Sequence, residues 1–369
     1  MPHRIAVIYG TRPEVIKMAP VVHALDRTAG LERIVCVTGQ HRTLLDQMME
    51  VFGLESQFDL NIMSECQSLA QVTTRVLKGI SRILDTVKPD FVLVQGDTTT
   101  SFAASLAAFY HGIPVGHIEA GLRSRDRLNP FPEEINRRLT TQLASVHFAP
   151  TELARLNLLR EGVHPQQIYI TGNTVVDALQ WVLARMTRDG WRCTGELEGI
   201  DWDESLPLLV TTHRRENWGN GIVQICRALR RVAQSDHRIR IVFPVHPNPA
   251  VRDTVVSHLG SSDRIHLIEP LPYPEFVAVM SRCRAVITDS GGVQEEVASL
   301  SKPVIITRET TERPEVVACG LGVLTGTDPD RIYAEVQRVL ASPPQLRISP
   351  FGDGRAATRV VHHLARLLN

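Results

Sequence analysis

Three carboxylates of this chain stand where acid–base chemistry would need them. Asp97 and Glu119 each follow a short apolar, β-branched run, and Glu133 falls in the first turn of a predicted helix that begins with proline. Arg137 lies one helical turn beyond Glu133, on the same face. Carboxylates held at such places can transfer protons. For Glu133 and Arg137, an ordinary stabilising pair on a helix is the simpler alternative.

Histidines follow two further apolar runs, in the second half of the chain. His213 stands beside Arg214 and Arg215, which suits either proton transfer or contact with a phosphate. His246 precedes two closely spaced prolines, so stiffening of a loop explains it equally well.

The first turn between a predicted strand and a predicted helix reads Gly10-Thr11-Arg12-Pro13-Glu14. It holds a single glycine, whereas a dinucleotide-binding turn needs three, so NAD is disfavoured. Arg12 and Lys17, near the start of a helix, form a candidate pyrophosphate site. An ordinary turn with a solvated arginine is the alternative.

A second turn of this kind contains Ser290, Gly291 and Gly292. Glycines let a backbone approach phosphate closely, and the start of the following helix favours negative charge. Glu296 lies one turn further on, where a carboxylate can accept the hydroxyls of a ribose. The same residues also fit a plain turn with a serine cap.

The composition is that of an ordinary globular protein. The 369 residues include 40 Lys and Arg against 40 Asp and Glu, which gives no reason to expect nucleic acid or an anionic membrane as a partner. Six scattered cysteines indicate reduced thiols and a cytoplasmic location. No metal site is expected, because Asp201-Trp202-Asp203 reads as a surface loop and the adjacent His362 and His363 point apart on a helix.

Short apolar runs alternate with segments of helical period, which predicts parallel sheets built from β-α-β units. The predicted strands are Arg4–Tyr9, Ile34–Thr38, Phe91–Gln95, Val115–Ile118, Ser145–Ala149, Pro207–Thr211, Arg240–Phe243, Arg264–Ile268, Ala285–Thr288 and Pro303–Ile306. The alternation pauses at 172–205. We therefore expect an α/β protein of two doubly wound, Rossmann-like domains, residues 1–172 and 173–352, facing across a cleft. A tail helix is expected at 353–369, and a return of this helix to the first domain is one placement for it.

Taken together and in order, the motifs resemble those of the non-hydrolysing UDP-N-acetylglucosamine 2-epimerases. The resemblance covers nearly the whole chain. It rests on Gly10–Glu14, Gln40–Arg42, Gly96–Thr100, Glu119–Arg123, Pro132–Glu134, His213–Asn217, Asp289–Glu296 and Thr311–Glu315.

The resemblance implies a GT-B type fold and the interconversion of UDP-GlcNAc and UDP-ManNAc, without added cofactor, as a supply of precursors for surface polysaccharide. The implied catalytic residues are Asp97, Glu119, Glu133 and His213. The implied substrate contacts are Arg12, Lys17, Arg137, Leu271, Phe276, Ser290, Gly291, Gly292, Glu296 and Arg313.

The family also implies a homodimer and a second UDP-GlcNAc that acts as an activator. The matching positions for the activator are Gln40, His41, Gln67, Arg214 and His246. Cys66 and Thr43 depart from residues found in some members, which puts strict dependence on the activator in doubt. The main alternatives are an epimerase of a modified UDP-sugar and a GT-B glycosyltransferase; a hydrolysing relative and a sugar-nucleotide sensor fit less well.

Overall fold

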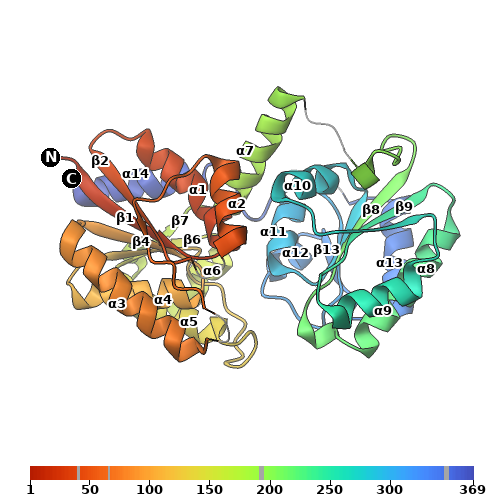
Figure 1. The fold of residues 1–369 in the computed structure, drawn as a ribbon, viewed down its shortest axis with the longest axis horizontal. Coiled ribbons are helices and arrows are strands. Elements are labelled where there is room, and N and C mark those ends of the chain that lie inside the picture. Colours follow the sequence, from red (N-terminus) through yellow and green to blue (C-terminus); the bar gives the residue numbers. More distant parts are fainter. Residues whose placement is uncertain (40–41, 65–66, 191–194, 345–348) are drawn as a thin grey trace. The chain divides into compact units, whose positions relative to one another are not determined.

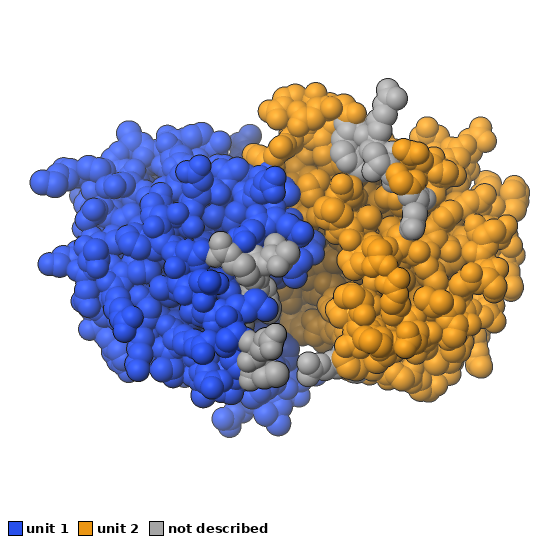
Figure 2. Space-filling model, in the orientation of Figure 1, with its two compact units in different colours: residues 1–178, 351–369 blue, residues 179–350 orange. Residues whose placement is uncertain are grey.

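The computed structural model describes residues 1–39, 42–64, 67–190, 195–344 and 349–369. The chain forms two compact units, residues 1–178 with 351–369, and residues 179–350 (Figures 1 and 2). We call them unit 1 and unit 2. Each is a parallel sheet covered by helices, which confirms the predicted α/β class of two Rossmann-like domains.

Unit 1 is built on a seven-stranded sheet in the order β3-β2-β1-β4-β5-β6-β7. Its strands are β1 (His3–Tyr9), β2 (Leu31–Val37), β3 (Phe58–Asp59), β4 (Phe91–Gln95), β5 (Val115–Ile118), β6 (Val146–Ala149) and β7 (Ile168–Ile170). Its helices are α1 (Arg12–Asp26), α2 (Arg42–Phe52), α3 (Leu69–Val87), α4 (Thr99–Tyr110), α5 (Glu133–Leu143), α6 (Glu152–Arg160), the short η1 (Pro165–Gln167) and α14 (Ala356–Leu368). Helix α7 (Thr174–Asp189) begins in unit 1 and continues into unit 2.

Unit 2 repeats this order with six strands, β10-β9-β8-β11-β12-β13. They are β8 (Leu206–Thr211), β9 (Ile239–Pro244), β10 (Ile265–Ile268), β11 (Ala285–Thr288), β12 (Val304–Ile306) and β13 (Gly322–Leu324). The helices are η2 (Gly195–Leu197), η3 (Arg215–Asn217), α8 (Asn220–Ser235), α9 (Pro249–Leu259), α10 (Tyr273–Arg282), α11 (Gly291–Ser299), α12 (Pro314–Ala318) and α13 (Pro329–Ala341). Helices α8, α9 and α13 cover one face of this sheet, and α10, α11 and α12 cover the other (Figure 1).

The chain reverses its direction of travel across each sheet at one point. In unit 1 this switch lies between β1 and β4, whose strands pair in parallel, and in unit 2 it lies between β8 and β11. Loops leaving such neighbouring strands diverge to opposite faces and leave a place for ligands beyond the strand ends. The predicted functional residues follow mainly these strands and β5.

Packing explains why the elements are stable. Helix α3 starts at Ser68 in a capping box with Gln71 and buries one apolar stripe, which includes Val76 and Ile80. Helix α4 is alanine-rich on its buried face, which lets it pack closely against both α3 and the sheet. The tail helix α14 packs on α1 within unit 1, and Asp177 accepts hydrogen bonds from the first backbone amides of α14.

Asp201 and His363 belong to the two motifs that were set aside in the sequence, and each has an ordinary structural partner. Asp201 accepts hydrogen bonds from the backbone amides of Asp203 and Glu204, as a turn residue does. The ring of His363 lies against Tyr169, at 4.2 Å between centroids. Among the described residues no group of three or more His, Cys, Asp or Glu side chains is arranged as a metal-ligand set, and no helix is both long and apolar enough to cross a bilayer.

Candidate functional site

A buried carboxylate, Glu14, joins the two loops at the switch point of unit 1. Its Oε2 accepts hydrogen bonds from the backbone amides of Gly10 (3.0 Å) and Thr11 (2.9 Å), and its Oε1 accepts one from the Thr98 hydroxyl (2.7 Å). Burial raises the pKa of Glu14 to about 7, although these hydrogen bonds oppose the shift. The loop after β1 is thereby tied to the residue that follows Asp97.

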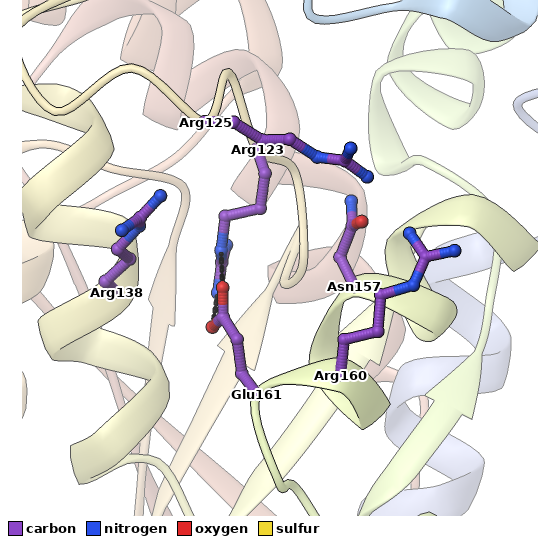
Figure 3. A pocket seen from close by; sticks show the side chains of 6 residues that line it. All are labelled: Arg123, Arg125, Arg138, Asn157, Arg160 and Glu161. Carbon is purple, nitrogen blue, oxygen red and sulfur yellow. Dashed lines mark hydrogen bonds and ion pairs between the residues drawn. The ribbon is translucent and has the colours of Figure 1, made fainter.

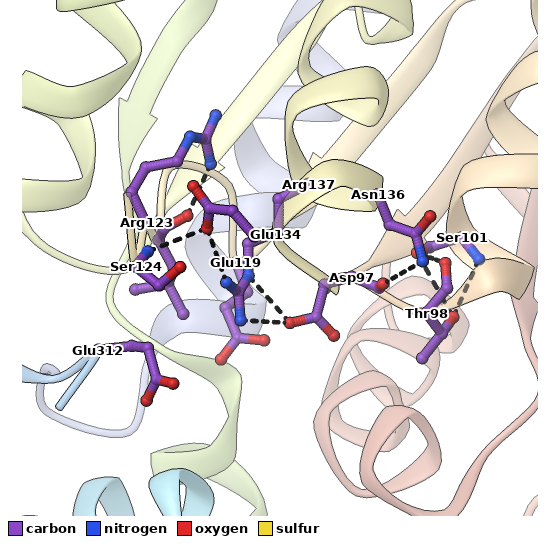
Figure 4. Close-up of polar contacts among 12 residues, drawn as sticks. Asp97, Thr98, Ser101, Glu119, Arg123, Ser124, Glu134, Asn136, Arg137 and Glu312 are labelled. Carbon is purple, nitrogen blue, oxygen red and sulfur yellow. Dashed lines mark hydrogen bonds and ion pairs between the residues drawn. The ribbon is translucent and has the colours of Figure 1, made fainter. Parts of the chain in front are cut away.

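Asp97 is oriented by a single arginine. Its Oδ2 accepts a hydrogen bond from Arg137 Nε (2.9 Å) and forms an ion pair with Arg137 Nη2 (2.7 Å). Its backbone carbonyl accepts a hydrogen bond from the Asn136 amide (2.9 Å; Figure 4). Asp97 keeps 28% of its side chain exposed, whereas Arg137 keeps only 5%. A partly exposed carboxylate on a buried, rigid support is suited to meeting a ligand.

Glu119 is held in a buried polar cluster. Its carboxylate accepts hydrogen bonds from Lys17, Gln95 and Asn173, and its backbone has a φ of +65°. A left-handed conformation is costly for a residue with a β-carbon, so these contacts must hold it in place. Lys17, which the resemblance predicts as a diphosphate contact, thus has a carboxylate partner within unit 1.

Asp97 and Glu119 lie at the ends of neighbouring strands. Gly96 has a φ of +71°, and a β-carbon on it would lie 3.4 Å from Glu119 Oε2. His117 Nε2 donates to the Gly96 carbonyl (2.7 Å), which requires a proton on that nitrogen. Burial lowers the pKa of His117 to about 4, so this ring is neutral and acts as a fixed support for the turn.

Glu134, absent from the predicted site, links Arg137 to the loop after β5. It is fully buried and accepts hydrogen bonds from Arg137 Nη1 (3.1 Å) and Arg138 Nε (3.1 Å), and from the backbone amides of Ser124 and Arg125. Burial alone would raise the pKa of Glu134, but the hydrogen bond from Ser124 and the two arginine charges together lower it.

Two of the predicted residues stand at helix starts. Glu133 is the first residue of α5, and Arg12 is the first residue of α1.

In unit 2 the corresponding buried carboxylate is Asp289. It accepts hydrogen bonds from the Thr212 hydroxyl (2.8 Å), the His213 and Arg214 backbone amides, and the Asn217 amide (3.0 Å). Asp289 is 0% exposed, so these donors replace its water.

His213, a predicted catalytic residue, lies beside this carboxylate. Its Nδ1 is 3.3 Å from Asp289 Oδ1, and its ring stacks on His246 with centroids 6.1 Å apart. Burial lowers the pKa of His213, while the charge of Asp289 opposes the shift. The His213 side chain is nevertheless 45% exposed. Sequence reasoning assigned His213 and His246 to separate roles, but the structure places their rings together.

The Arg313 guanidinium lies close to the glycine turn of unit 2, which consists of Ser290, Gly291 and Gly292. Arg313 Nε donates to Glu295 (2.8 Å), and a β-carbon on Gly291 would lie 2.8 Å from Arg313 Nη1. Glycine is therefore needed at 291 for the guanidinium to reach the start of α11. Ser290 is the N-cap residue of α11, but its side chain makes no capping hydrogen bond.

Arg313 is part of a larger network of charged side chains. Glu312 accepts hydrogen bonds from Arg308 (2.8 Å) and lies 3.7 Å from Arg313 and 3.8 Å from Arg214. Burial opposes ionisation of Glu312, but the Arg308 hydrogen bond and the nearby arginine charges lower its pKa to about 2.

The remaining predicted contacts surround α10 and the activator positions. Glu296 accepts a hydrogen bond from the Tyr273 hydroxyl (2.7 Å), and the half-buried Leu271 and Phe276 flank Tyr273 in sequence. Gln67 accepts one from Arg75 (3.0 Å). Gln40, His41 and Cys66 lie outside the described residues, and the structure does not describe the Thr43 side chain.

Sequence reasoning missed several residues that support the site, namely Glu14, Gln95, Glu134, Asn173, Tyr273 and Asp289. Glu14 carried a usable signal, because a threonine followed three residues later by glutamate is the pattern of a capping box. Gln95 and Asp289 stand at strand ends. Asn173 and Tyr273 offer no local signal, since their partners are distant in sequence.

Comparison with known proteins fits this geometry. Residues 23–365 match the model of the family described as UDP-N-acetylglucosamine 2-epimerase. The UDP-N-acetylglucosamine 2-epimerase of Escherichia coli K12 is 49% identical, with 98% of each chain covered, and that of Bacillus subtilis is 45% identical, with 98% of this chain and 94% of the relative covered.

Solved structures are similar over the whole chain as well. The UDP-GlcNAc 2-epimerase of Neisseria meningitidis, bound to UDP-GlcNAc, is 42% identical with a TM-score of 0.91, over 98% of this chain and 100% of that one. That of Methanocaldococcus jannaschii, in complex with UDP-GlcNAc and UDP, is 35% identical with a TM-score of 0.85, over 98% and 99%. With the strand-end carboxylates of unit 1 and the arginine-capped glycine turn of unit 2, these matches show that the chain belongs to the UDP-N-acetylglucosamine 2-epimerase family and is an isomerase.

Proposed function

We propose that this chain interconverts UDP-GlcNAc and UDP-ManNAc by eliminating UDP and adding it back. The relatives of E. coli and B. subtilis carry the name of this activity, and the N. meningitidis structure holds UDP-GlcNAc. The observation that carries the mechanism is the pair Asp97 and Glu119, held on either side of Gly96 at neighbouring strand ends.

The chemistry explains the need for several acids. Carbon 2 of the sugar is not next to a carbonyl, so its proton becomes acidic only as the C1–O bond to UDP breaks. Loss of UDP and of this proton gives a glycal; return of UDP to C1 and of a proton to the other face of C2 gives the epimer. The reaction requires two proton-transfer groups and cations for the leaving diphosphate.

We assign proton transfer to the carboxylates of unit 1, Asp97, Glu119 and Glu133, with His213 of unit 2 as a further proton carrier. Arg137 orients Asp97 with a hydrogen bond and an ion pair to one oxygen. Lys17 donates a hydrogen bond to Glu119, and its predicted contact with the diphosphate stays part of the proposal.

The diphosphate is assigned to Arg12, Arg313 and the start of α11. A helix N-terminus and a guanidinium at one place favour a phosphate, because amide donors and a positive charge act on it together. The close approach of Arg313 to Gly291 supports this assignment. Glu296, oriented by Tyr273, is the proposed acceptor for ribose hydroxyls, and Leu271 and Phe276 are the proposed contacts of the uracil.

The proposal also covers an activator, the oligomeric state, the cellular location and the use of the product. A second UDP-GlcNAc would act as an activator at Gln40, His41, Gln67, Arg214 and His246. The M. jannaschii structure, in complex with UDP-GlcNAc and UDP, supports this part of the proposal. A homodimer, a cytoplasmic location and a supply of surface-polysaccharide precursors complete the proposal.

Solvent exchange at carbon 2 tests the reaction. The protein is incubated with UDP-GlcNAc in D2O and followed by proton NMR. Deuterium at C2 together with UDP-ManNAc is the expected result. Free ManNAc would indicate hydrolysis instead, and a lack of exchange at every UDP-GlcNAc concentration would reject the assignment.

A further inference from the structure

A polar cavity in unit 1 is lined mainly by arginines. Its volume is about 370 Å³, at the lower end of the range of small-molecule pockets, roughly 300–1,000 Å³. Six side chains line it, those of Arg123, Arg125, Arg138, Asn157, Arg160 and Glu161 (Figure 3). We call it the arginine pocket.

The wall of the pocket is rigid. Arg123 pairs with Glu161 through two hydrogen bonds, Nε to Oε1 and Nη2 to Oε2, each 2.7 Å, and it also binds the Thr141 hydroxyl (2.9 Å). Asn157 is buried and donates to the Gly121 carbonyl (3.0 Å). Arg123 and Glu161 therefore neutralise each other and form structure rather than a charged surface.

The charge of the pocket is not balanced. The charged residues that line the pocket, together with the side chains joined to them by a chain of ion pairs, comprise five arginines and three carboxylates, which leaves an excess of two positive charges. The arginines are Arg123, Arg125, Arg137, Arg138 and Arg160, and the carboxylates are Asp97, Glu134 and Glu161. Glu134 is shared between two arginines. Within the part of the chain that the structure describes, neither the Arg125 nor the Arg160 guanidinium has a hydrogen bond or ion pair.

Both residues line the same pocket, and Figure 3 shows the Arg125 guanidinium above Asn157 and the Arg160 guanidinium beside it. The dipole of α6 explains an arginine at position 160, in the last turn. It does not explain Arg125, which has a φ of +67° and whose backbone amide is bound by Glu134 (3.3 Å). Two unpaired guanidiniums directed at one cavity suit a phosphate group, whose oxygens accept forked hydrogen bonds.

We propose that the arginine pocket binds the phosphate group of a small phosphorylated molecule and that this binding is coupled to Asp97 through Glu134. Glu134 contacts the Arg125 amide and the Arg138 side chain at the pocket, and it also contacts Arg137, which orients Asp97 (Figure 4). A phosphate that draws Arg138 away from Glu134 strengthens the hold of Glu134 on Arg137. The binding part stands independently; the coupling part rests on the proposed function.

Binding is tested without turnover, by calorimetry at fixed ionic strength with UDP present in excess to fill its own site. The two probes are inorganic phosphate and glucose 6-phosphate, which separate the free ion from a phosphate ester. Two charge-assisted contacts predict a dissociation constant on the order of 1 mM or tighter. Arg125→Gln with Arg160→Gln should weaken binding about tenfold or more. Arg155→Gln, on the same helix but paired with Glu152, is the matched control and should bind as the wild type does.

Equal binding by the double variant and the wild type would overturn the proposal, as would failure of both probes to bind the wild type. For the coupling, phosphate should change kcat in the wild type and in Arg155→Gln but not in the double variant, whose activity without phosphate stays normal. A phosphate effect of equal size in the double variant would reject the coupling and leave the epimerase assignment intact.

Discussion

At the switch point of each unit, a buried carboxylate links the two loops that leave the neighbouring strands. The carboxylate belongs to the first loop in unit 1 and to the second loop in unit 2. In unit 1 a carboxylate from the first loop, Glu14, binds amides of its own loop and reaches Thr98 in the second. In unit 2 a carboxylate from the second loop, Asp289, reaches back to Thr212, His213 and Arg214 in the first. Both are almost wholly buried.

The difference lies in what stands next to each carboxylate. Glu14 binds backbone and hydroxyl donors, so it shapes loops. Asp289 also lies 3.3 Å from the His213 ring, so it shapes a titrating group as well. One sheet topology thus supports a carboxylate-rich edge in unit 1 and an edge rich in arginine and histidine in unit 2.

The largest effect on activity is expected from a substitution of Asp97, the partly exposed carboxylate of unit 1. Asp97→Asn should lower kcat about 10³-fold, because the amide cannot accept the proton while Arg137 still orients it. UDP affinity, measured by calorimetry, should change little. Asp263→Asn, an exposed aspartate of unit 2, is the control. Full activity of Asp97→Asn would remove Asp97 from the mechanism.

The raised pKa of Glu14 predicts that the unfolding free energy falls as the pH rises toward 7. Its pKa is about 7 in the folded protein against 4.5 when free, so the folded state holds the proton more tightly. Its contribution is complete below pH 4.5 and is lost as the pH rises through 7. Relative to Glu14→Gln, the wild type should lose about 3 kcal/mol of unfolding free energy across that window, as measured by urea titrations.

Glu152→Gln, an exposed glutamate in the first turn of α6, provides the matched control and should follow the pH dependence of the wild type. Parallel stability curves for the wild type and Glu14→Gln would show that Glu14 does not hold its proton.

Asp289→Asn separates the two roles in unit 2. Loss of the negative charge should lower the pKa of His213 further, because Asp289 is the main group that raises it. The His213 resonance followed by NMR, and the acidic limb of the kcat profile if His213 carries a proton, should both move to lower pH, with stability reduced by about 2 kcal/mol. A stability loss with an unmoved His213 titration would make Asp289 purely structural.

The smallest effect concerns the glycine turn. Gly291→Ala places a methyl group 2.8 Å from Arg313 Nη1, so the guanidinium must shift and UDP should bind about tenfold more weakly. Gly292→Ala meets nothing within 4 Å and leaves Arg313 in place, so its effect on the UDP dissociation constant should be smaller. Equal losses in the two variants would argue against the role given to Arg313.

The ten strands predicted from apolar runs are all present. The three that were missed, β3, β7 and β13, have two or three residues each and lie at sheet edges. An edge strand pairs on one side only and is less buried, so it carries a weaker apolar pattern.

Local sequence was enough for the α/β class, the positions of strand ends and the residue types gathered there, because side-chain period and turn residues are encoded within a few positions. The polar partners of these side chains were decided by tertiary structure alone. Lys17 in α1 contacts Glu119 across 102 residues, and the His213 backbone amide donates to Asp289 across 76. No spacing in the chain predicts such contacts, since they arise only when the folded sheet and its helices bring distant segments together.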